Sequence, residues 1–322
     1  MPASLTRRAT LGLLAMPAVV VAQPAWPTRS VRIIISFPPG GSSDFVARVV
    51  APQLSEMFGQ QFVVDNRPGA GGMLAAEALK REAPDGHTFL LSNNAPFTIA
   101  PTMFPRITYD AMRDFSHVAY LGSTYGGFVV HPNVGARSVA ELIAKAKAAP
   151  GRLNYGSSGV GSIGHITGAN FGLMAGIDIV HVPYRGAGAL RIDLSSGVVG
   201  LAFEGIVTSL PAIAAGSLVG LAVASDTRLP PAPAIPTFRE AGFDIEVKNW
   251  HGLSAPANLP PAISARLQAG LAEICRRQTT IDQFASIGNF YDPMSGEAFA
   301  RFVGDQIAIW RPMIIAADAV ER

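Results

Sequence analysis

The 322-residue chain has one cysteine, few charged residues and no long hydrophobic run. A single cysteine, Cys275, excludes an intramolecular disulfide framework and a zinc or iron–sulfur site built from cysteines. Charged residues make up 15% of the chain and no Lys/Arg run exceeds a pair, so the footprint of a nucleic-acid-binding protein is absent. Hydrophobic residues make up 49%, which is enough for a buried core and argues against disorder. The length predicts two domains.

The N-terminal segment predicts export. An apolar stretch from Leu11 to Ala22 follows Arg7-Arg8 and is too short to span a bilayer, which needs about 20 residues. Val20-Val21-Ala22 is an acceptable cleavage site, so residues 1–22 are predicted to be a secretory signal peptide. Thr6-Arg7-Arg8 also fits a loose twin-arginine signal, and a retained membrane anchor is the other alternative. No cysteine follows the apolar stretch, which disfavours a lipoprotein.

Removal of this segment leaves a neutral chain. It would take two arginines from the 25 basic residues and none from the 23 acidic residues. The mature protein would then carry no net formal charge. No second hydrophobic segment approaches membrane-spanning length. We therefore expect a periplasmic protein of roughly 300 residues without permanent membrane attachment.

The mature chain alternates predicted strands and helices. Short β-branched or apolar runs predict strands at 31–36, 61–64, 87–92, 128–131, 153–155, 177–182, 198–203 and 218–224. Helical patterns lie at 45–58, 73–82, 139–148, 163–175, 190–195, 262–276 and 296–309. Pro52 should kink the first helix or delay its start, and the prolines within 228–236 predict a rigid extended loop. This order predicts an α/β fold with parallel strands joined by crossover helices.

Three glycine-rich loops follow predicted strands, where parallel α/β sheets bind ligands. They span Pro39–Asp44, Asn66–Gly72 and Gly156–Ser162. Glycine lets the backbone approach a ligand closely, and a helix N-terminus offers unpaired N–H groups and a positive dipole end. Such loops favour a carboxylate. The alternatives are a plain helix start capped by Ser42 or Asp44, and for Asn66–Gly72 a turn that packs its helix on the sheet.

Enzymatic readings find little support. Residues Gly159–Gly164 match the dinucleotide fingerprint G-x-G-x-x-G, but Asp178 comes too early for its acidic partner and an exported protein has little access to nicotinamide cofactors. Residues Gly156–Val160 lack the final glycine of the hydrolase pattern G-x-S-x-G. No H-E-x-x-H or clustered carboxylate pattern indicates a metal. We therefore expect no catalytic residue, no metal and no cofactor.

An ordered set of short motifs runs through almost the whole mature chain. It comprises Trp26-Pro27, Val31–Phe37, Pro38–Asp44, Asn66–Gly72, Pro84–Thr88, Asn154–Gly159, Val182–Gly186, Trp250–Leu253 and Ala255-Pro256. In this set the chain resembles the periplasmic solute-binding proteins of tripartite tricarboxylate transporters, often called the Bug family. The resemblance implies a two-lobed clamshell of the type II periplasmic-binding-protein class with a mostly parallel sheet in each lobe. The first lobe would comprise residues 23–124 plus 248–322, and the second lobe residues 125–247.

The resemblance also implies the ligand and the partners. A small carboxylate would sit in the cleft between the lobes, held by backbone amides and hydroxyls of the first and third loops. The permease subunits in the membrane would receive it. The ligand-binding residues carried over are Phe37, Gly41, Ser42, Asp44, Ser157, Ser158, Gly161, Ser162, His165, Tyr184 and Asp193. Glu204, and Asn93 and Asn94 at the end of a strand, are further candidates for the wall of the cleft. A sensor or scavenger of carboxylates without a dedicated permease is the alternative.

Two departures from the family pattern concern the distal end of the ligand. Gly186–Leu190 replaces an Ala-Pro-Ala-like element, and Glu204 stands where the family often has Asp. The longer Glu204 side chain could fill part of the pocket. Tyr184 could instead be a core aromatic residue and Asp193 a surface acid. The sequence therefore leaves the identity of the carboxylate open.

Overall fold

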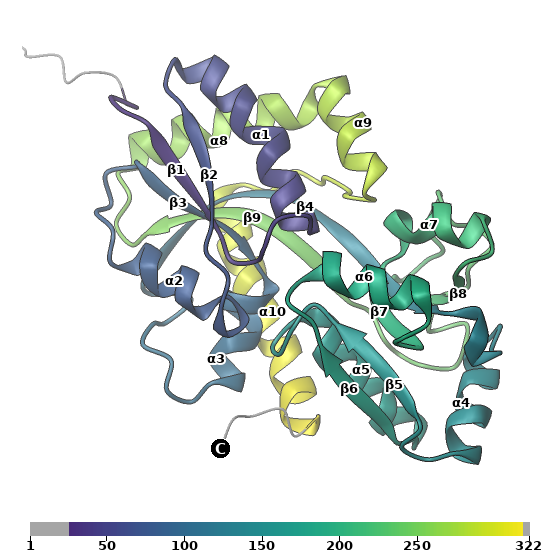
Figure 1. Cartoon of the computed structure of the whole chain (residues 1–322). Coiled ribbons are helices and arrows are strands. Elements are labelled where there is room, and N and C mark those ends of the chain that lie inside the picture. Colours follow the sequence, from purple (N-terminus) through teal and green to yellow (C-terminus); the bar gives the residue numbers. More distant parts are fainter. Residues whose placement is uncertain (1–25, 318–322) are drawn as a thin grey trace, which may run out of the picture.

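The computed structural model describes residues 26–317 (Figure 1), and the predicted signal peptide lies outside them. The strands are β1 (Val31–Ile35), β2 (Phe62–Asn66), β3 (Thr88–Asn93), β4 (Phe115–Val130), β5 (Leu153–Ser157), β6 (Ile179–Pro183), β7 (Leu201–Gly205), β8 (Val219–Val223) and β9 (Lys248–Pro256). The α-helices are α1 (Ser42–Phe58), α2 (Met73–Lys80), α3 (Ala100–Met103), α4 (Val139–Ala148), α5 (Ile163–Ala175), α6 (Ala187–Ser196), α7 (Ile206–Ala214), α8 (Pro261–Arg276), α9 (Gln278–Ser286) and α10 (Gly296–Ala316). Short 3₁₀ or π turns lie at Ala70–Gly72, Ala95–Ile99 and Pro132–Val134.

One mixed sheet runs through the molecule in the order β2-β1-β3-β9-β4-β7-β5-β6, with β8 also paired to β4. The pairs β1–β2, β1–β3, β5–β6 and β5–β7 are parallel, as predicted for an α/β fold. The pairs that involve β4 or β9 are antiparallel, which makes the sheet mixed rather than mostly parallel. We call β1, β2 and β3 the first part of the sheet, and β5, β6, β7 and β8 the second part.

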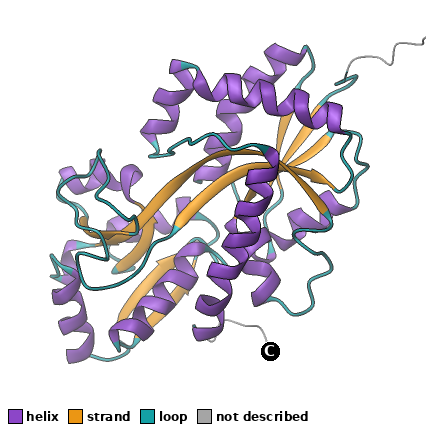
Figure 2. Ribbon diagram, turned by 180° about the vertical axis from the view of Figure 1, so that it is seen from behind, coloured by secondary structure: helices purple, strands orange, loops and turns teal. Residues whose placement is uncertain are grey.

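Strands β4 and β9 connect the two parts. Residues Phe115–Tyr125 of β4 pair with β9, and residues Gly126–Val130 of the same strand pair with β7 and β8. Figure 2 shows these long curved strands passing from one part to the other. The sheet is therefore continuous across the molecule, and the lobe boundaries inferred from the family stay a prediction.

Helices cover both faces of the first part. Residues of α1 and α8 pack on one face, and residues of α2 and α10 pack on the other. Strand β3 is buried along its whole length, as expected for a strand covered on both faces. Helix α10 reaches further than predicted: Phe299 packs in the core of the first part, whereas Trp310 and Ile314 pack with α5 residues in the core of the second.

Several elements differ from the sequence predictions. Helix α1 begins at Ser42 and continues through Pro52, so this proline does not delay the start of the helix. Strand β9 and helices α7 and α9 were not predicted, and β4 is much longer than the predicted 128–131. Between residues 26 and 317, no helix is both long and apolar enough to cross a membrane.

Candidate functional site

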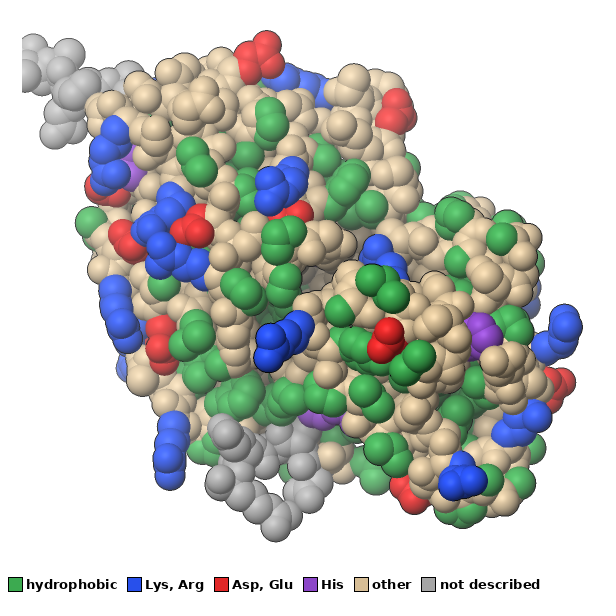
Figure 3. All heavy atoms as spheres, in the orientation of Figure 1, with side chains coloured by type: hydrophobic (Ala, Val, Ile, Leu, Met, Phe, Trp, Pro, Cys, Tyr) green, Lys and Arg blue, Asp and Glu red, His purple; other side chains and the backbone are tan. Residues whose placement is uncertain are grey.

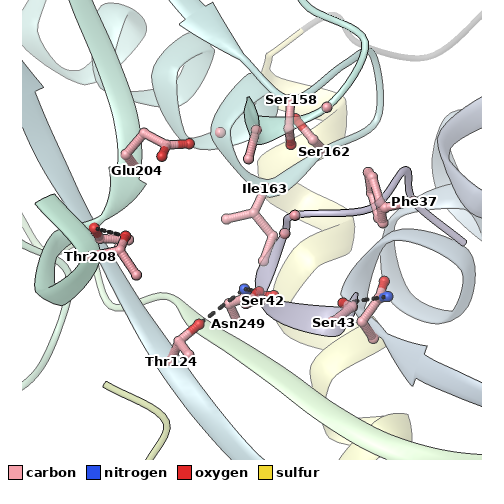
Figure 4. A pocket seen from close by; sticks show the side chains of 18 of the residues that line it. Phe37, Ser42, Ser43, Thr124, Ser158, Ser162, Ile163, Glu204, Thr208 and Asn249 are labelled. Carbon is pink, nitrogen blue, oxygen red and sulfur yellow. Dashed lines mark hydrogen bonds between the residues drawn. The ribbon is translucent and has the colours of Figure 1, made fainter. Parts of the chain in front are cut away.

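A cavity of about 250 Å³ lies between the loops of the two parts. Its wall includes residues that follow β1, β3, β5, β6 and β7, the ends at which a parallel α/β sheet binds ligands. Thr124 and Asn249, from the connecting strands β4 and β9, close one side (Figure 4). On the face shown in Figure 3, lysine and arginine side chains are scattered rather than gathered into one patch.

Four helices begin at the wall of this cavity. The N-cap residues of α1, α5, α6 and α7 are Gly41, Ser162, Gly186 and Gly205, and all four line the cavity. Only Ser162 caps its helix with a side chain, by accepting a hydrogen bond from the His165 amide at 3.3 Å. The first amides of a helix have no intrahelical acceptor, and its N-terminus carries a partial positive charge. The cavity is therefore suited to an anion, with N–H donors from both parts of the sheet.

The side chain of Asp44, the last residue of the first loop, holds this loop in place. The Asp44 carboxylate accepts hydrogen bonds from the Gly40 amide at 3.2 Å, from Arg48 Nε at 3.0 Å and from Asn66 Nδ2 at 3.0 Å. Burial by itself would raise the pKa of Asp44, but these hydrogen bonds outweigh it and lower the pKa below its ordinary value. Neither Ser42 nor Asp44 is the N-cap of α1, because that position belongs to Gly41. The loop therefore presents backbone and not a capping side chain.

The third loop divides its serines between the cavity and the protein interior. Ser158 lines the cavity, and its hydroxyl makes no hydrogen bond to any other residue within 26–317. Ser157 is buried, and its Oγ lies 2.7 Å from His181 Nε2. His165 stacks on His181 with ring centroids 4.1 Å apart, so it supports the loop from behind. Only one of the two adjacent serines can therefore reach a ligand.

The second loop does not line the cavity. A side chain at Gly71 would meet the Val160 carbonyl and Phe104, and a side chain at Gly161 would meet the Cα of Gly71. The two glycines thus allow the second and third loops to touch. This contact fits the packing alternative for Asn66–Gly72 better than a ligand-binding role.

An ion pair forms part of the wall at the second part of the sheet. Arg191 Nε donates to Glu204 Oε2 at 3.0 Å, and both residues line the cavity. Burial raises the pKa of the Glu204 carboxyl above its ordinary value, although the charge and hydrogen bond of Arg191 act in the opposite direction. Tyr184 and Asp193 form a separate pair, in which the tyrosine hydroxyl donates to Asp193 Oδ2 at 2.9 Å outside the lining.

The structure places the predicted ligand-binding residues in two groups. Phe37, Gly41, Ser42, Ser158, Ser162 and Glu204 line the cavity. Asp44, Asn94, Ser157, Gly161, His165, Tyr184 and Asp193 do not line it, and most of them hold the lining loops. Their role in ligand binding stays a prediction.

Of the two candidates at the end of β3, Asn93 lines the cavity and Asn94 does not. Sequence reasoning missed other residues of the wall. Thr124, Arg191, Thr208 and Asn249 also contribute polar side chains. Arg191 stands close to Asp193 in the sequence, which was the only signal for it. Among the described residues, no group of three or more His, Cys, Asp or Glu side chains could hold a metal ion.

Comparison with known proteins assigns the family. The sequence model of the tripartite tricarboxylate transporter family receptor matches residues 46–318. The chain belongs to this family. The protein is thus a solute receptor, a non-enzymatic binding protein, and its α/β fold is that of periplasmic binding proteins. This assignment agrees with the family resemblance. It does not support a role for the dinucleotide fingerprint or the hydrolase pattern.

Three relatives illustrate the similarity. The receptor is 33% identical to protein BugT of Bordetella pertussis (strain Tohama I) over 299 residues, which cover 92% of each chain. R. palustris Rpa4515, solved with adipate, is 33% identical with a TM-score of 0.86, and the match covers 91% of this chain and 98% of that one. MatC (Rpa3494) from Rhodopseudomonas palustris, solved with bound malate, is 27% identical with a TM-score of 0.83, over 90% of this chain and 100% of that one.

Proposed function

We propose that this receptor captures a small carboxylate in the cavity between the two parts of the sheet and delivers it to a tripartite tricarboxylate-type permease. The observation that carries the proposal is the convergence of four helix N-termini on one cavity. Among the described residues that line it, the only charged side chains are Arg191 and Glu204, which are paired with each other. A carboxylate needs several N–H donors, and these helix starts supply them without an added lysine. Adipate and malate in the two solved relatives belong to the same chemical class.

The hydrogen-bond donors that line the cavity come from both parts of the sheet, which suggests how the receptor could signal that it is loaded. Gly41 and Ser42 belong to α1 of the first part, whereas Ser158 and Ser162 belong to the second. A ligand that contacts both parts stabilises the closed arrangement, because its binding free energy is realised fully only there. A closed surface is what a permease could distinguish from an empty receptor. Export by the predicted signal peptide, residues 1–22, would bring the receptor to the periplasm, where the ligand is captured.

A thermal-shift screen of residues 23–322 against a panel of carboxylates tests the proposal. A ligand at about 100 times its Kd adds roughly 2.7 kcal/mol of stability, which raises Tm by several degrees. We expect one class of carboxylates to raise Tm, with little response to amines or neutral sugars. A panel in which no carboxylate raises Tm, with native mass spectrometry showing an empty protein, contradicts carboxylate capture. Loss of uptake of the same compound in cells that lack the receptor tests the delivery step, and unchanged uptake would favour a sensor or scavenger.

A further inference from the structure

The Glu204 carboxylate is a fixed feature of the cavity wall. Glu204 belongs to β7 and pairs with Gly127 of β4, so its backbone is set by the sheet and not by a loop. The residue is only 7% exposed, yet it lines the cavity, and Figure 4 shows its carboxylate directed into that space. A ligand that fills the cavity must therefore meet this group.

Only one of the two carboxylate oxygens has a partner in the protein. Oε2 accepts the hydrogen bond from Arg191 Nε at 3.0 Å, and Oε1 has no hydrogen bond to another residue within 26–317. The Arg191 side chain is 41% exposed and approaches from α6 through its Nε edge. The Arg191 guanidinium favours the ionised form of Glu204, and the oxygens of an ionised carboxylate can only accept hydrogen bonds. The cavity therefore contains an acceptor that calls for a donor on the ligand.

The requirement for a donor limits which carboxylates fit. A second carboxylate placed against Glu204 would be repelled by its charge, and a methylene there would leave Oε1 desolvated without a partner. A hydroxyl or an ammonium group on the ligand would donate a hydrogen bond to Oε1. We infer that the ligand carries, beside the carboxylate held by the helix N-termini, a hydroxyl or ammonium group that donates to Glu204 Oε1. This inference rests on the proposed function and narrows its ligand class to hydroxy or amino acids.

Matched acids that differ only in the donor test the inference. Calorimetry of wild-type receptor compares succinate with malate and aspartate, glutarate with 2-hydroxyglutarate and glutamate, and phenylacetate with mandelate. In the series that binds, we expect the donor-bearing acid to bind at least about tenfold more tightly than the plain acid. Equal or tighter binding of the plain acid overturns the inference and leaves carboxylate capture intact. Binding of no acid in any series contradicts the proposed function itself, and the inference falls with it.

A variant of Glu204 and a control variant test whether Glu204 causes the preference for donor-bearing acids. Glu204→Gln keeps the shape of the side chain but removes its charge and places an amide N–H₂ beside the ligand. We expect this variant to lose the preference for an ammonium group, while a hydroxyl, which can also accept, keeps part of its advantage. The matched control is Glu56→Gln, the same change at an exposed position of α1 outside the cavity lining, which should leave the preference unchanged. A preference for the ammonium-bearing acid that survives in Glu204→Gln overturns the role of this residue, provided that Tm without ligand shows the variant folded.

Discussion

His251 Nε2 lies 3.1 Å from the Oγ of Ser42, the first residue of α1. On its other side, His251 Nδ1 lies 3.3 Å from Asn289 Oδ1, and Asn289 Nδ2 donates to the Leu121 carbonyl at 2.8 Å. His251 and Asn289 are buried. A chain of side chains thus leads from a backbone carbonyl in the core to the edge of the ligand cavity.

The chemistry of the groups fixes which atom donates in each of these hydrogen bonds. The Leu121 carbonyl only accepts, so the Asn289 amide nitrogen must face it and Oδ1 must face His251. Nδ1 of His251 therefore carries the proton. Burial lowers the pKa of His251 to about 4, so the ring is neutral at pH 7 and Nε2 accepts. The Ser42 hydroxyl then donates to His251, and its proton is not available to a ligand.

We expect Ser42→Ala to lower stability more than affinity. The change leaves His251 Nε2 without a donor and removes one acceptor of Asn249, which also donates to Thr124. Loss of such a partner costs about 1–3 kcal/mol of unfolding free energy. Ligand binding through the backbone N–H groups of α1 should stay within a few-fold of wild type. Urea denaturation and calorimetry measure the two effects, with the exposed Ser286→Ala as the control. A tenfold weaker affinity with unchanged stability would mean that the hydroxyl binds the ligand directly.

The sequence predicted the parallel parts of the fold because their signals are local. β-branched runs such as Val31–Ile35, followed by a glycine loop and a helical pattern, mark a strand and its crossover without reference to the rest of the chain. Strand β9 has no such signal. Its Gly252, His251 and Ser254 give it a low strand propensity, and it is extended because β3 and β4 pair with it on both sides.

Among the site residues too, those with a local sequence signal could be predicted and those placed by distant contacts could not. Gly41 and Ser158 could be predicted because each stands in a loop between a strand and a helix. Whether a neighbour points inward depends on the pleat: Asn93 lines the cavity, whereas Asn94 accepts a hydrogen bond from the Trp250 amide. Asn249 Nδ2 donates to Ser42 Oγ at 3.1 Å, although the two residues are more than 200 positions apart in the sequence. No local pattern could indicate this contact.

The neighbouring serines of the third loop should respond in opposite ways to substitution. Ser158→Ala removes a free hydroxyl from the cavity wall, so affinity should fall about fivefold, the equivalent of about 1 kcal/mol, with no change in Tm. Ser157→Ala removes the partner of His181 at 2.7 Å and should lower Tm while affinity changes little. Calorimetry and melting curves of the two variants provide the comparison. The reverse pattern would show that the loop turns Ser157 toward the ligand.

Stability should fall as the pH is lowered from 7 to 5. His117 is buried between Ser254 Oγ and the Ala111 carbonyl, each 2.9 Å from a ring nitrogen. Burial lowers the pKa of His117 to about 4, whereas the unfolded chain binds the proton near its ordinary pKa of 6.5. The unfolded state therefore gains protons first, and the stabilisation present above pH 6.5 is lost as the pH falls toward 4.

The variant His117→Asn isolates this contribution. Between pH 7 and pH 5, one such histidine should account for a loss of about 2 kcal/mol of unfolding free energy. The variant is less stable at pH 7, but its decline over this interval should be smaller by that amount. Buried His251, with a pKa also lowered to about 4, contributes a decline that both proteins share. Urea midpoints at the two pH values measure the difference, and identical declines would show that the folded protein binds a proton at His117 with the same pKa as the unfolded chain.

A side chain at Gly41 should abolish binding without unfolding the receptor. The residue has φ −89° and ψ 172°, a conformation open to any L-residue, and no atom lies within 4 Å of where its Cβ would stand. That empty space is the cavity, since Gly41 lines it and caps α1. A valine there would occupy the position of the ligand carboxylate and hold it away from the helix amides.

Gly188 offers a matched control for this substitution. It also has no atom within 4 Å of an added Cβ, but it stands on the exposed side of α6, outside the cavity lining. We expect Gly41→Val to weaken binding of the cognate carboxylate at least a hundredfold, because the carboxylate loses several charge-assisted hydrogen bonds together. Gly188→Val should bind like wild type, and both variants should melt within a few degrees of it. Wild-type affinity in Gly41→Val would place the carboxylate elsewhere, because a ligand held by the first amides of α1 cannot share their approach with an isopropyl group.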